Sequence, residues 1–454
     1  MAKAAAAAAN RIELHDRDAL ATARAVLEAC ADPQAMGEAV KAAVQRNARW
    51  RGEQCINLLA AEAPTSPGVR ALLASEIGTR AAEGHIGPVN RWFAGTRHID
   101  ELEALCVELL KRYFRCNYAD HRLCASMIGN AVAYTALSQP GDVVMTAPQP
   151  AGGHSSNRND GPAGVMGRKV VDIPFDPQEL VVDIDAFRKA APLARPKLVA
   201  LGLSMTLFPQ PVTAMKEVIA EWGGRFFFDA AHQLGLIGGG QFQDPLREGA
   251  DIMTGSAGKT FAGPQSGIIV WDDPEITESV CHAVFPVWAA THQVNRVAAL
   301  ALATAESIAY GEAYMAQIVR NAQALARALQ ERGIPMLGAH KGFTQTHQAI
   351  ADMRQYGRGL KVAQALEKAN IIVNKNLIPT DKPADWDYPG GIRIGTIEMT
   401  RLGMKEREME QIAEMIARVV VHGESAEAVK KDVLALRGGY QTLYYCFENG
   451  LPPK

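Results

Sequence analysis

Short apolar runs that end on a polar residue dominate the middle of the chain. Their length and their content of branched and aromatic residues are typical of buried strands. The pattern predicts strands near residues 121–125, 142–147, 197–203, 226–228 and 268–271. Apolar residues with helical spacing lie between these runs, for example over residues 99–116 and 212–222. Strands that alternate with helices predict an α/β protein with a mostly parallel sheet.

Helical spacing also marks both ends of the chain. Residues 17–50 are expected to form a helical arm, and residues 294–333 contain long helices that mark the passage into a second, smaller domain. A further helix is predicted near the C-terminus, and the first ten residues, MAKAAAAAAN, are expected to form a disordered or helical tail. The prediction is therefore a tail and arm over 1–50, a large domain over 51–300 and a small α+β domain over 301–454.

One polar cluster is predicted where central strands end. The apolar run Phe226–Phe228 ends on Asp229, His232 would share that strand end, and Lys259 follows among small residues. Open α/β sheets bind ligands at the carboxyl ends of their strands, so the aspartate and the lysine can meet in one crevice. Pyridoxal phosphate chemistry needs this pair, because the lysine holds the aldehyde as a Schiff base and the carboxylate keeps the pyridine nitrogen protonated. Either residue alone could equally be a strand-end cap or a solvated loop lysine.

Composition narrows the class of protein. The 454 residues are 48% hydrophobic and carry a formal charge of −2, which fits a soluble globular protein and argues against a nucleic-acid partner. The seven cysteines form no C-x-x-C pair, as expected of reduced thiols in a cytoplasmic protein. No apolar segment has the length of a membrane span, so no membrane partner is expected. No His/Cys cluster has metal-ligand spacing, so no metal site is expected either.

Several motifs resemble those of one enzyme family. Residues 229–235, DAAHQLG, and 259–264, KTFAGP, are similar to the D-x-A-H-x-x-G and K-T-x-x-G-P motifs of serine hydroxymethyltransferases, which are fold-type-I pyridoxal phosphate enzymes. Further matches follow the family order: INLLAAEAPTSP (56–67), AEGH (82–85), AGGH (151–154), VNKN (373–376) and GGIRIGT (390–396). The resemblance covers residues 55–436. It implies the fold-type-I architecture, with a mostly parallel seven-stranded sheet in the large domain.

The resemblance also implies a cofactor site, residue by residue. Lys259 carries pyridoxal 5'-phosphate, Asp229 pairs with the pyridine nitrogen and His154 stacks on the ring. The other expected cofactor residues are Ser126, Asn130, Ser204, His232, Ser256, Thr291 and His292. Thr291 and His292 stand where bacterial and animal enzymes have a glycine-rich loop, and this points to the archaeal hydroxymethyltransferases and the related L-threonine transaldolases.

The expected substrate residues are Arg393, Glu83, Glu62 and Asn376. Arg393 lies in the G-I-R-I-G-T motif and is expected to bind the amino-acid carboxylate, because a guanidinium pairs with a carboxylate through two hydrogen bonds. Glu83 matches the glutamate that transfers a proton at the substrate hydroxymethyl group, and Asn376 lies in the folate-side loop. One departure is Ala61, which stands in place of a serine that helps to hold the substrate carboxylate.

The predicted activity is aldol-type cleavage and formation of a Cα–Cβ bond on glycine and β-hydroxy amino acids. The first interpretation is a serine hydroxymethyltransferase that uses tetrahydrofolate or a related pterin. An L-threonine transaldolase or aldolase that uses a larger aldehyde without folate is the alternative. A catalytically silent binding protein of the same fold is a third. Family members draw phosphate contacts from two subunits, so the resemblance implies a homodimer or higher homo-oligomer with shared active sites.

Overall fold

The computed structural model describes residues 15–453, so the predicted tail at the extreme N-terminus lies outside the described residues. The chain divides into two compact units, one ending at Cys55 and the other spanning Ile56–Lys454. Among the described residues, no helix combines the length and the apolar character that crossing a membrane requires.

The N-terminal unit is helical, as the sequence predicts, but its helix is interrupted. Helix α2 (Arg17–Glu28) and helix α3 (Pro33–Asn47) are followed by a π-helix, η1 (Ala48–Gln54). The interruption has a local cause, because Asp32 caps α3 through a 2.8 Å bond from the amide of Ala35 and proline occupies the first position of that helix.

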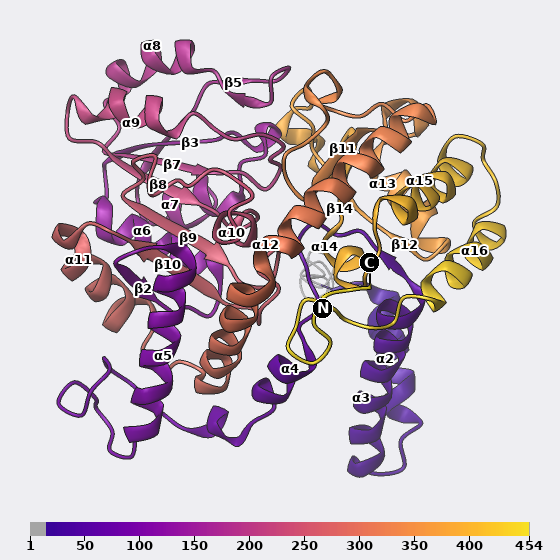
Figure 1. Cartoon of the computed structure of the whole chain (residues 1–454), viewed down its shortest axis with the longest axis horizontal. Coiled ribbons are helices and arrows are strands. Elements are labelled where there is room, and N and C mark those ends of the chain that lie inside the picture. The colour runs from indigo at the N-terminus through magenta and orange to yellow at the C-terminus, as the bar shows by residue number, and fades with distance from the viewer. Residues whose placement is uncertain (1–14, 454) are drawn as a thin grey trace, which may run out of the picture. The chain divides into compact units, whose positions relative to one another are not determined.

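A seven-stranded sheet forms the centre of the second unit, and this confirms the expected fold (Figure 1). Its order is β2-β10-β9-β8-β7-β3-β4. The five strands from β9 to β4 are parallel, whereas β10 runs antiparallel to both of its neighbours. The bounds are β2 Tyr118–Asp120, β3 Val143–Thr146, β4 Lys169–Asp172, β7 Leu198–Gly202, β8 Arg225–Asp229, β9 Ile252–Ser256 and β10 Gly267–Trp271. The prediction of a strand over 121–125 was wrong, since β2 ends at Asp120 and a loop follows it.

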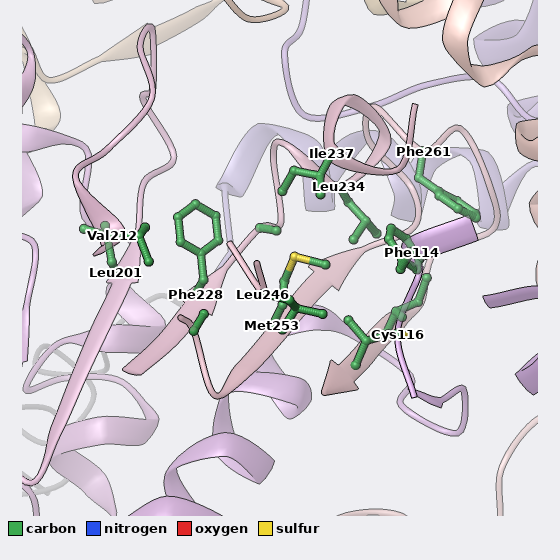
Figure 2. Close-up of a cluster of buried hydrophobic side chains, with 14 of the residues drawn as sticks. Phe114, Cys116, Leu201, Val212, Phe228, Leu234, Ile237, Leu246, Met253 and Phe261 are labelled. Carbon is green, nitrogen blue, oxygen red and sulfur yellow. The ribbon is translucent and has the colours of Figure 1, made fainter. Parts of the chain in front are cut away.

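Alternate residues of the strands face two helical layers. One layer consists of α5 (Arg97–Phe114), α8 (Ile184–Ala194), α9 (Val212–Ala220), α10 (Leu234–Gly238) and α12 (Val294–Glu331). The other contains α6 (Ser126–Leu137), α7 (Pro162–Val165) and α11 (Thr277–His282). Phe226 and Phe228 pack toward the first layer and Phe227 toward the second. Both faces of this strand are buried, which is why it is apolar throughout. Figure 2 shows Phe228 among the buried side chains of the first layer.

A second, smaller group of strands follows α12. Strands β11 (Gln348–Asp352), β14 (Gly391–Gly395) and β13 (Asn374–Asn376) form an antiparallel sheet, and β12 (Ile371–Ile372) pairs with β1 (Ile56–Asn57). The helices here are α13 (Arg358–Lys368), α14 (Ile397–Arg401), α15 (Glu406–Val420) and α16 (Ala426–Gly438), while α4 (Pro67–Leu73) packs against α12. Helix α12 runs unbroken through residue 300, where the two domains were predicted to meet (Figure 1). That boundary stays a prediction.

Candidate active site

Four strand ends and loops surround one cavity of about 400 Å³. Asp229 is the last residue of β8, and Lys259 lies three residues beyond the end of the parallel neighbour β9. The loop after β3 brings His154 to the same edge of the sheet, and β14 of the small sheet brings Arg393. The carboxyl ends of parallel strands meet at one edge, which is why residues distant in sequence converge here.

Asp229 is held by amide groups from two other segments. Its Oδ2 accepts hydrogen bonds from Asn130 Nδ2 at 2.7 Å and from Asn157 Nδ2 at 3.2 Å, and its Oδ1 accepts one from the amide of Ala231 at 3.0 Å. The carboxylate is 5% exposed, and no lysine or arginine is paired with it in the described part of the chain. Neutral donors thus fix the carboxylate in place without a salt bridge, so it can serve as a partner for a protonated ring nitrogen.

Two glycines let the His154 loop pass against the backbone. Gly152 has a φ of +96°, and a Cβ built there would lie 2.6 Å from the carbonyl oxygen of Met205. A Cβ on Gly153 would lie 2.0 Å from the carbonyl oxygen of Ala147. The amide of Ser204 donates to the carbonyl of Gly152 at 2.6 Å, which fixes the loop beside the end of β7. Burial lowers the pKa of His154, so its imidazole is neutral near pH 7.

Lys259 is a buried amine with a perturbed pKa. Burial lowers the pKa of Lys259 to about 8, with Arg393 adding to the effect and Asp229 opposing it. A lysine with a pKa in this range has a substantial neutral fraction near physiological pH, and the neutral amine is the form that attacks a carbonyl. The geometry therefore suits a lysine that forms a Schiff base.

Arg393 is a buried cation in need of an anion. Its Nη1 donates to the carbonyl of Ser204 at 2.5 Å and its Nε to Asn374 Oδ1 at 3.2 Å. None of the ion pairs formed by the described residues involves it, and burial lowers its pKa to about 10. An uncompensated guanidinium in a cavity is the arrangement expected of a binding site for a carboxylate.

A group of polar residues surrounds Arg393 beside the cavity. His232 Nε2 lies 3.4 Å from Arg393 Nη1, and its Nδ1 lies 3.2 Å from Gln348 Nε2. His347 stacks on His232 with ring centroids 5.7 Å apart, and its Nε2 lies 3.1 Å from the carbonyl oxygen of Ala60. Burial, with the nearby cations, lowers the pKa of both histidines, so both are neutral. No role for Gln348 or His347 could be predicted from the sequence.

The mouth of the cavity is formed by β13 and the segment that follows it. Asn376 and Lys375 line it together with Trp386, which is 61% exposed. Lys375 Nζ donates to the carbonyl of Asp387 at 2.9 Å and so fastens the Trp386 segment to β13. Glu62 lies in the loop beside Lys259, because the amide of its neighbour Ala63 donates to the carbonyl of Gly258 at 3.1 Å.

The start of α6 is the candidate phosphate site. Ser126 is the first residue of α6, and Ala125 before it offers no side-chain cap. Ser256 ends β9 opposite Gly267, and a Cβ on Gly267 would lie 2.4 Å from the carbonyl oxygen of Ala125, so Ser256 and the start of α6 lie near each other. Uncapped amides at the N-terminus of a twelve-residue helix suit a phosphate. Asn130, one turn further along, has its amide committed to Asp229 and its oxygen to Thr254 Oγ1 at 2.8 Å.

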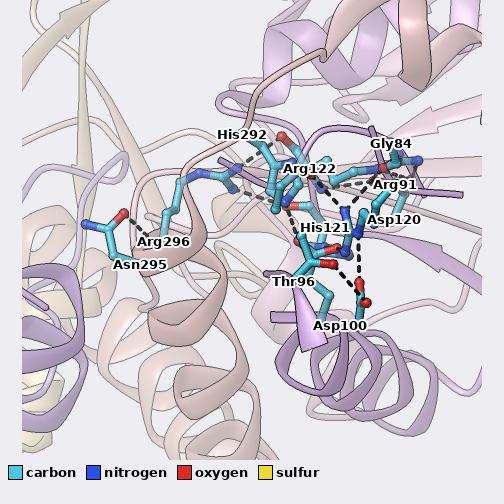
Figure 3. A network of polar contacts seen from close by, with 12 residues as sticks. Gly84, Arg91, Thr96, Asp100, Asp120, His121, Arg122, His292, Asn295 and Arg296 are labelled. Atoms are coloured by element: carbon cyan, nitrogen blue, oxygen red, sulfur yellow. Dashed lines mark hydrogen bonds and ion pairs between the residues drawn. The ribbon is translucent and has the colours of Figure 1, made fainter. Parts of the chain in front are cut away.

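In the described part of the chain, Glu83, Thr291 and His292 neither line this cavity nor form a side-chain hydrogen bond with a residue that lines it. Glu83 and Thr291 lie beside each other, with Thr291 Oγ1 3.4 Å from Glu83 Oε2, and neither lines the cavity that holds Lys259. His292 lies in a polar network (Figure 3), and its Nε2 is 2.5 Å from Glu103 Oε1. The expected role of His292, at a loop that in the family reaches the cofactor phosphate of the other subunit, stays a prediction.

Comparison with known proteins shows which family the chain belongs to. A sequence model of the family "Serine hydroxymethyltransferase" matches residues 34–416. The chain belongs to the serine hydroxymethyltransferase family. It is 43% identical to the serine hydroxymethyltransferase of Methanopyrus kandleri over 90% of this chain and 95% of that protein, and 43% identical to that of Methanocaldococcus jannaschii over 88% and 94%. The expected resemblance to the archaeal members is thereby confirmed.

A solved structure is similar over the same extent. The L-threonine transaldolase of Pseudomonas fluorescens superposes with a TM-score of 0.84 and 26% sequence identity, covering 91% of this chain and 94% of that one. This likeness confirms the fold-type-I architecture for the present family member. It also fits the expectation that hydroxymethyltransferase and transaldolase relatives share one scaffold.

Proposed function

We propose that this family member is a pyridoxal phosphate-dependent serine hydroxymethyltransferase that exchanges a one-carbon unit with a reduced pterin such as tetrahydrofolate. The observation that carries the proposal is the cavity lined by Lys259, His154 and Arg393, with the carboxylate of Asp229 close enough to Lys259 to act on its pKa. Relatives that bear this enzyme name are 40–43% identical over 86–92% of the chain.

The donor set fits the cofactor. Lys259 is a buried amine with its pKa lowered to about 8, Asp229 is a carboxylate held by neutral donors, and the paired glycines leave His154 beside the ring position. When bound, pyridoxal phosphate withdraws electrons from the Cα of the amino acid. Ser126 and Ser256, near the N-terminus of α6, would contact its phosphate.

The chain's own residues then decide which bond reacts. Arg393 binds the carboxylate of the amino acid and orients the molecule, while His232 and Gln348 hold the guanidinium in place. Asn376 and Trp386 at the mouth would receive the flat pterin. Glu83 would move the proton at the β-hydroxyl of serine, and this requires that a second copy of the chain bring Glu83 to the Lys259 cavity.

Conversion of serine by the purified protein tests the proposal. With pyridoxal phosphate present, glycine should form from serine when tetrahydrofolate or a methanopterin is added, and the Lys259→Ala variant should form none. A protein that gains no visible absorbance band with the cofactor would refute the enzymatic reading altogether and favour the silent binding module.

L-Threonine transaldolase activity is the second candidate, and the structural likeness to the Pseudomonas enzyme favours it. In that case added pterin would leave serine turnover unchanged, whereas threonine with an added aldehyde would release acetaldehyde and yield a new β-hydroxy amino acid. The two substrate sets, run in parallel on one preparation, separate the two activities.

A further inference from the structure

A polar network lies outside the Lys259 cavity, next to β2 at the edge of the large sheet. Its members come from helix α5, from the loop after β2 and from the loop before α12 (Figure 3). Three of its side chains are metal-ligating types, namely Glu103, His121 and His292, and one ligand atom of each lies within 4.8 Å of the others. All three are buried, with exposures of 0%, 2% and 5%.

Hydrogen bonding does not explain why the polar ring of His121 is buried. Neither of its ring nitrogens makes a hydrogen bond within the described part of the chain, and its Nε2 lies 3.5 Å from Glu103 Oε2, although the residue is almost fully buried. A buried imidazole without a partner costs roughly 1–3 kcal/mol, so such a group calls for an explanation.

The spacing of the donor atoms fits one ion. His121 Nε2 lies 3.5 Å from Glu103 Oε2, and two ligand atoms on a tetrahedral zinc at 2.0–2.2 Å lie roughly 3.4 Å apart. His292 Nε2 lies 2.5 Å from Glu103 Oε1, where the two share a hydrogen bond that an ion would replace by a modest opening of the pair. Two histidines and one glutamate form a ligand set that zinc takes with an open fourth position.

The surroundings supply an outer shell and room for a water ligand. Arg91 Nη2 donates to Glu103 Oε2 at 2.7 Å and its Nε to Asp100 Oδ1 at 2.7 Å, which orients the carboxylate. The nearby Arg122 is paired with Asp120 at 2.6 Å, so it adds no net charge. A cavity of about 380 Å³ borders Glu103 and His121 and provides an entry path.

We propose that Glu103, His121 and His292 form a binding site for a divalent transition-metal ion of the zinc class, with a water molecule as the fourth ligand. The ion links three segments, because Glu103 belongs to α5, His121 to the loop that leads to Ser126, and His292 to the loop that carries Thr291. Arg296 reinforces the second segment by donating to the carbonyls of His121 and Arg122 at 3.1 and 3.0 Å. The site does not depend on the proposed activity.

Zinc binding to untagged, chelator-treated protein tests the proposal by calorimetry and by thermal unfolding. Wild type should bind one zinc per chain and show a rise in Tm on the order of several degrees. His121→Val and His292→Asn should lose both responses. His121→Val is a safe variant, because replacing an unpartnered buried polar group with an apolar one is close to neutral without metal.

Two control variants test whether loss of zinc binding is specific to the proposed ligands. His98→Asn alters an exposed histidine on α5, and Lys259→Ala removes the amine that would hold the cofactor, so both should keep wild-type zinc binding. Cobalt(II) should give wild type a visible spectrum of four-coordinate type that His121→Val lacks. Absence of stoichiometric zinc in wild type, or equal binding by wild type and His121→Val, would overturn the metal site.

Discussion

Lys259 and Arg393 are two cations buried beside one cavity, and they differ in the charges of the groups around them. Asp229 partly offsets the burial of Lys259, whereas Arg393 meets only carbonyl, amide and imidazole groups. The protein groups at this site therefore include two cations and one nearby carboxylate. Two anionic groups, a cofactor phosphate and a substrate carboxylate, would compensate the charge of the two cations, so binding of both is electrostatically favourable.

The lowered pKa of Lys259 predicts the pH dependence of cofactor binding. Because only the neutral amine attacks the aldehyde, the rate of band formation on adding pyridoxal phosphate to cofactor-free protein should rise with pH and level off above about 8. An exposed lysine would instead require a pH near 10.4. Stopped-flow absorbance from pH 6 to 10 measures this midpoint. A midpoint near 10 would contradict the buried state of the amine.

Substitution of Arg393 is expected to change substrate binding but not thermal stability. Arg393→Lys should raise KM for serine by about 100-fold, because losing a charge-assisted bidentate pair in a buried site costs roughly 2–5 kcal/mol. The same change should leave Tm almost unaltered, since in the described part of the chain Arg393 has no carboxylate partner. Steady-state kinetics and differential scanning fluorimetry give the two readouts. A fall in Tm with an unchanged KM would show that Arg393 is structural.

At the scale of the element, the loop after β3 shows how backbone sets a side chain's position. Gly152 and Gly153 lie so close to the carbonyls of Met205 and Ala147 that no side chain fits, and His154 follows directly. The loop thus reaches the cavity only because both positions lack a Cβ.

Gly152→Ala should therefore weaken cofactor binding as well as the fold. The substitution adds both backbone strain at φ +96° and a contact of 2.6 Å with the Met205 carbonyl, so a loss on the order of 2 kcal/mol or more is expected. Gly141→Ala is the matched control, because Gly141 has φ +93° but open space around it. Cofactor titration and chemical denaturation of both variants measure the difference. Equal losses would attribute the effect to backbone strain alone.

The strand ends could be predicted from sequence because their signals are local. Phe226–Phe228 followed by Asp229 indicates a buried strand and its exit, and Lys259 among small residues marks a turn. The contacts between distant segments could not be predicted in this way. His121 was placed in a strand, and Glu103 and His292 lie 189 residues apart with no spacing that marks a site. The amide of Asn157 on Asp229 likewise arises from a loop whose sequence signals only a turn.

At the scale of the whole molecule, two of the expected site residues, Glu83 and Thr291, lie apart from the cavity that Lys259 lines. Glu83 and Thr291 face each other outside the Lys259 cavity, on a part of the surface that also carries apolar side chains. Val89, Trp92 and Phe93 in the segment after Glu83 are 94%, 74% and 46% exposed. Exposed aromatic residues beside two expected site residues favour an interface between two copies of the chain.

Complementation between two inactive variants tests whether the sites are shared. If Glu83 serves the cavity of the partner subunit, a hybrid dimer of Lys259→Ala and Glu83→Gln has one site with both defects and one with neither. Refolding an equal mixture forms hybrids as half of the dimers, so activity should return to about a quarter of the wild-type value. Each variant refolded alone is the control and should stay inactive. Sedimentation of the same samples would confirm the dimers, and hybrids without activity would place Glu83 in the cavity of its own chain.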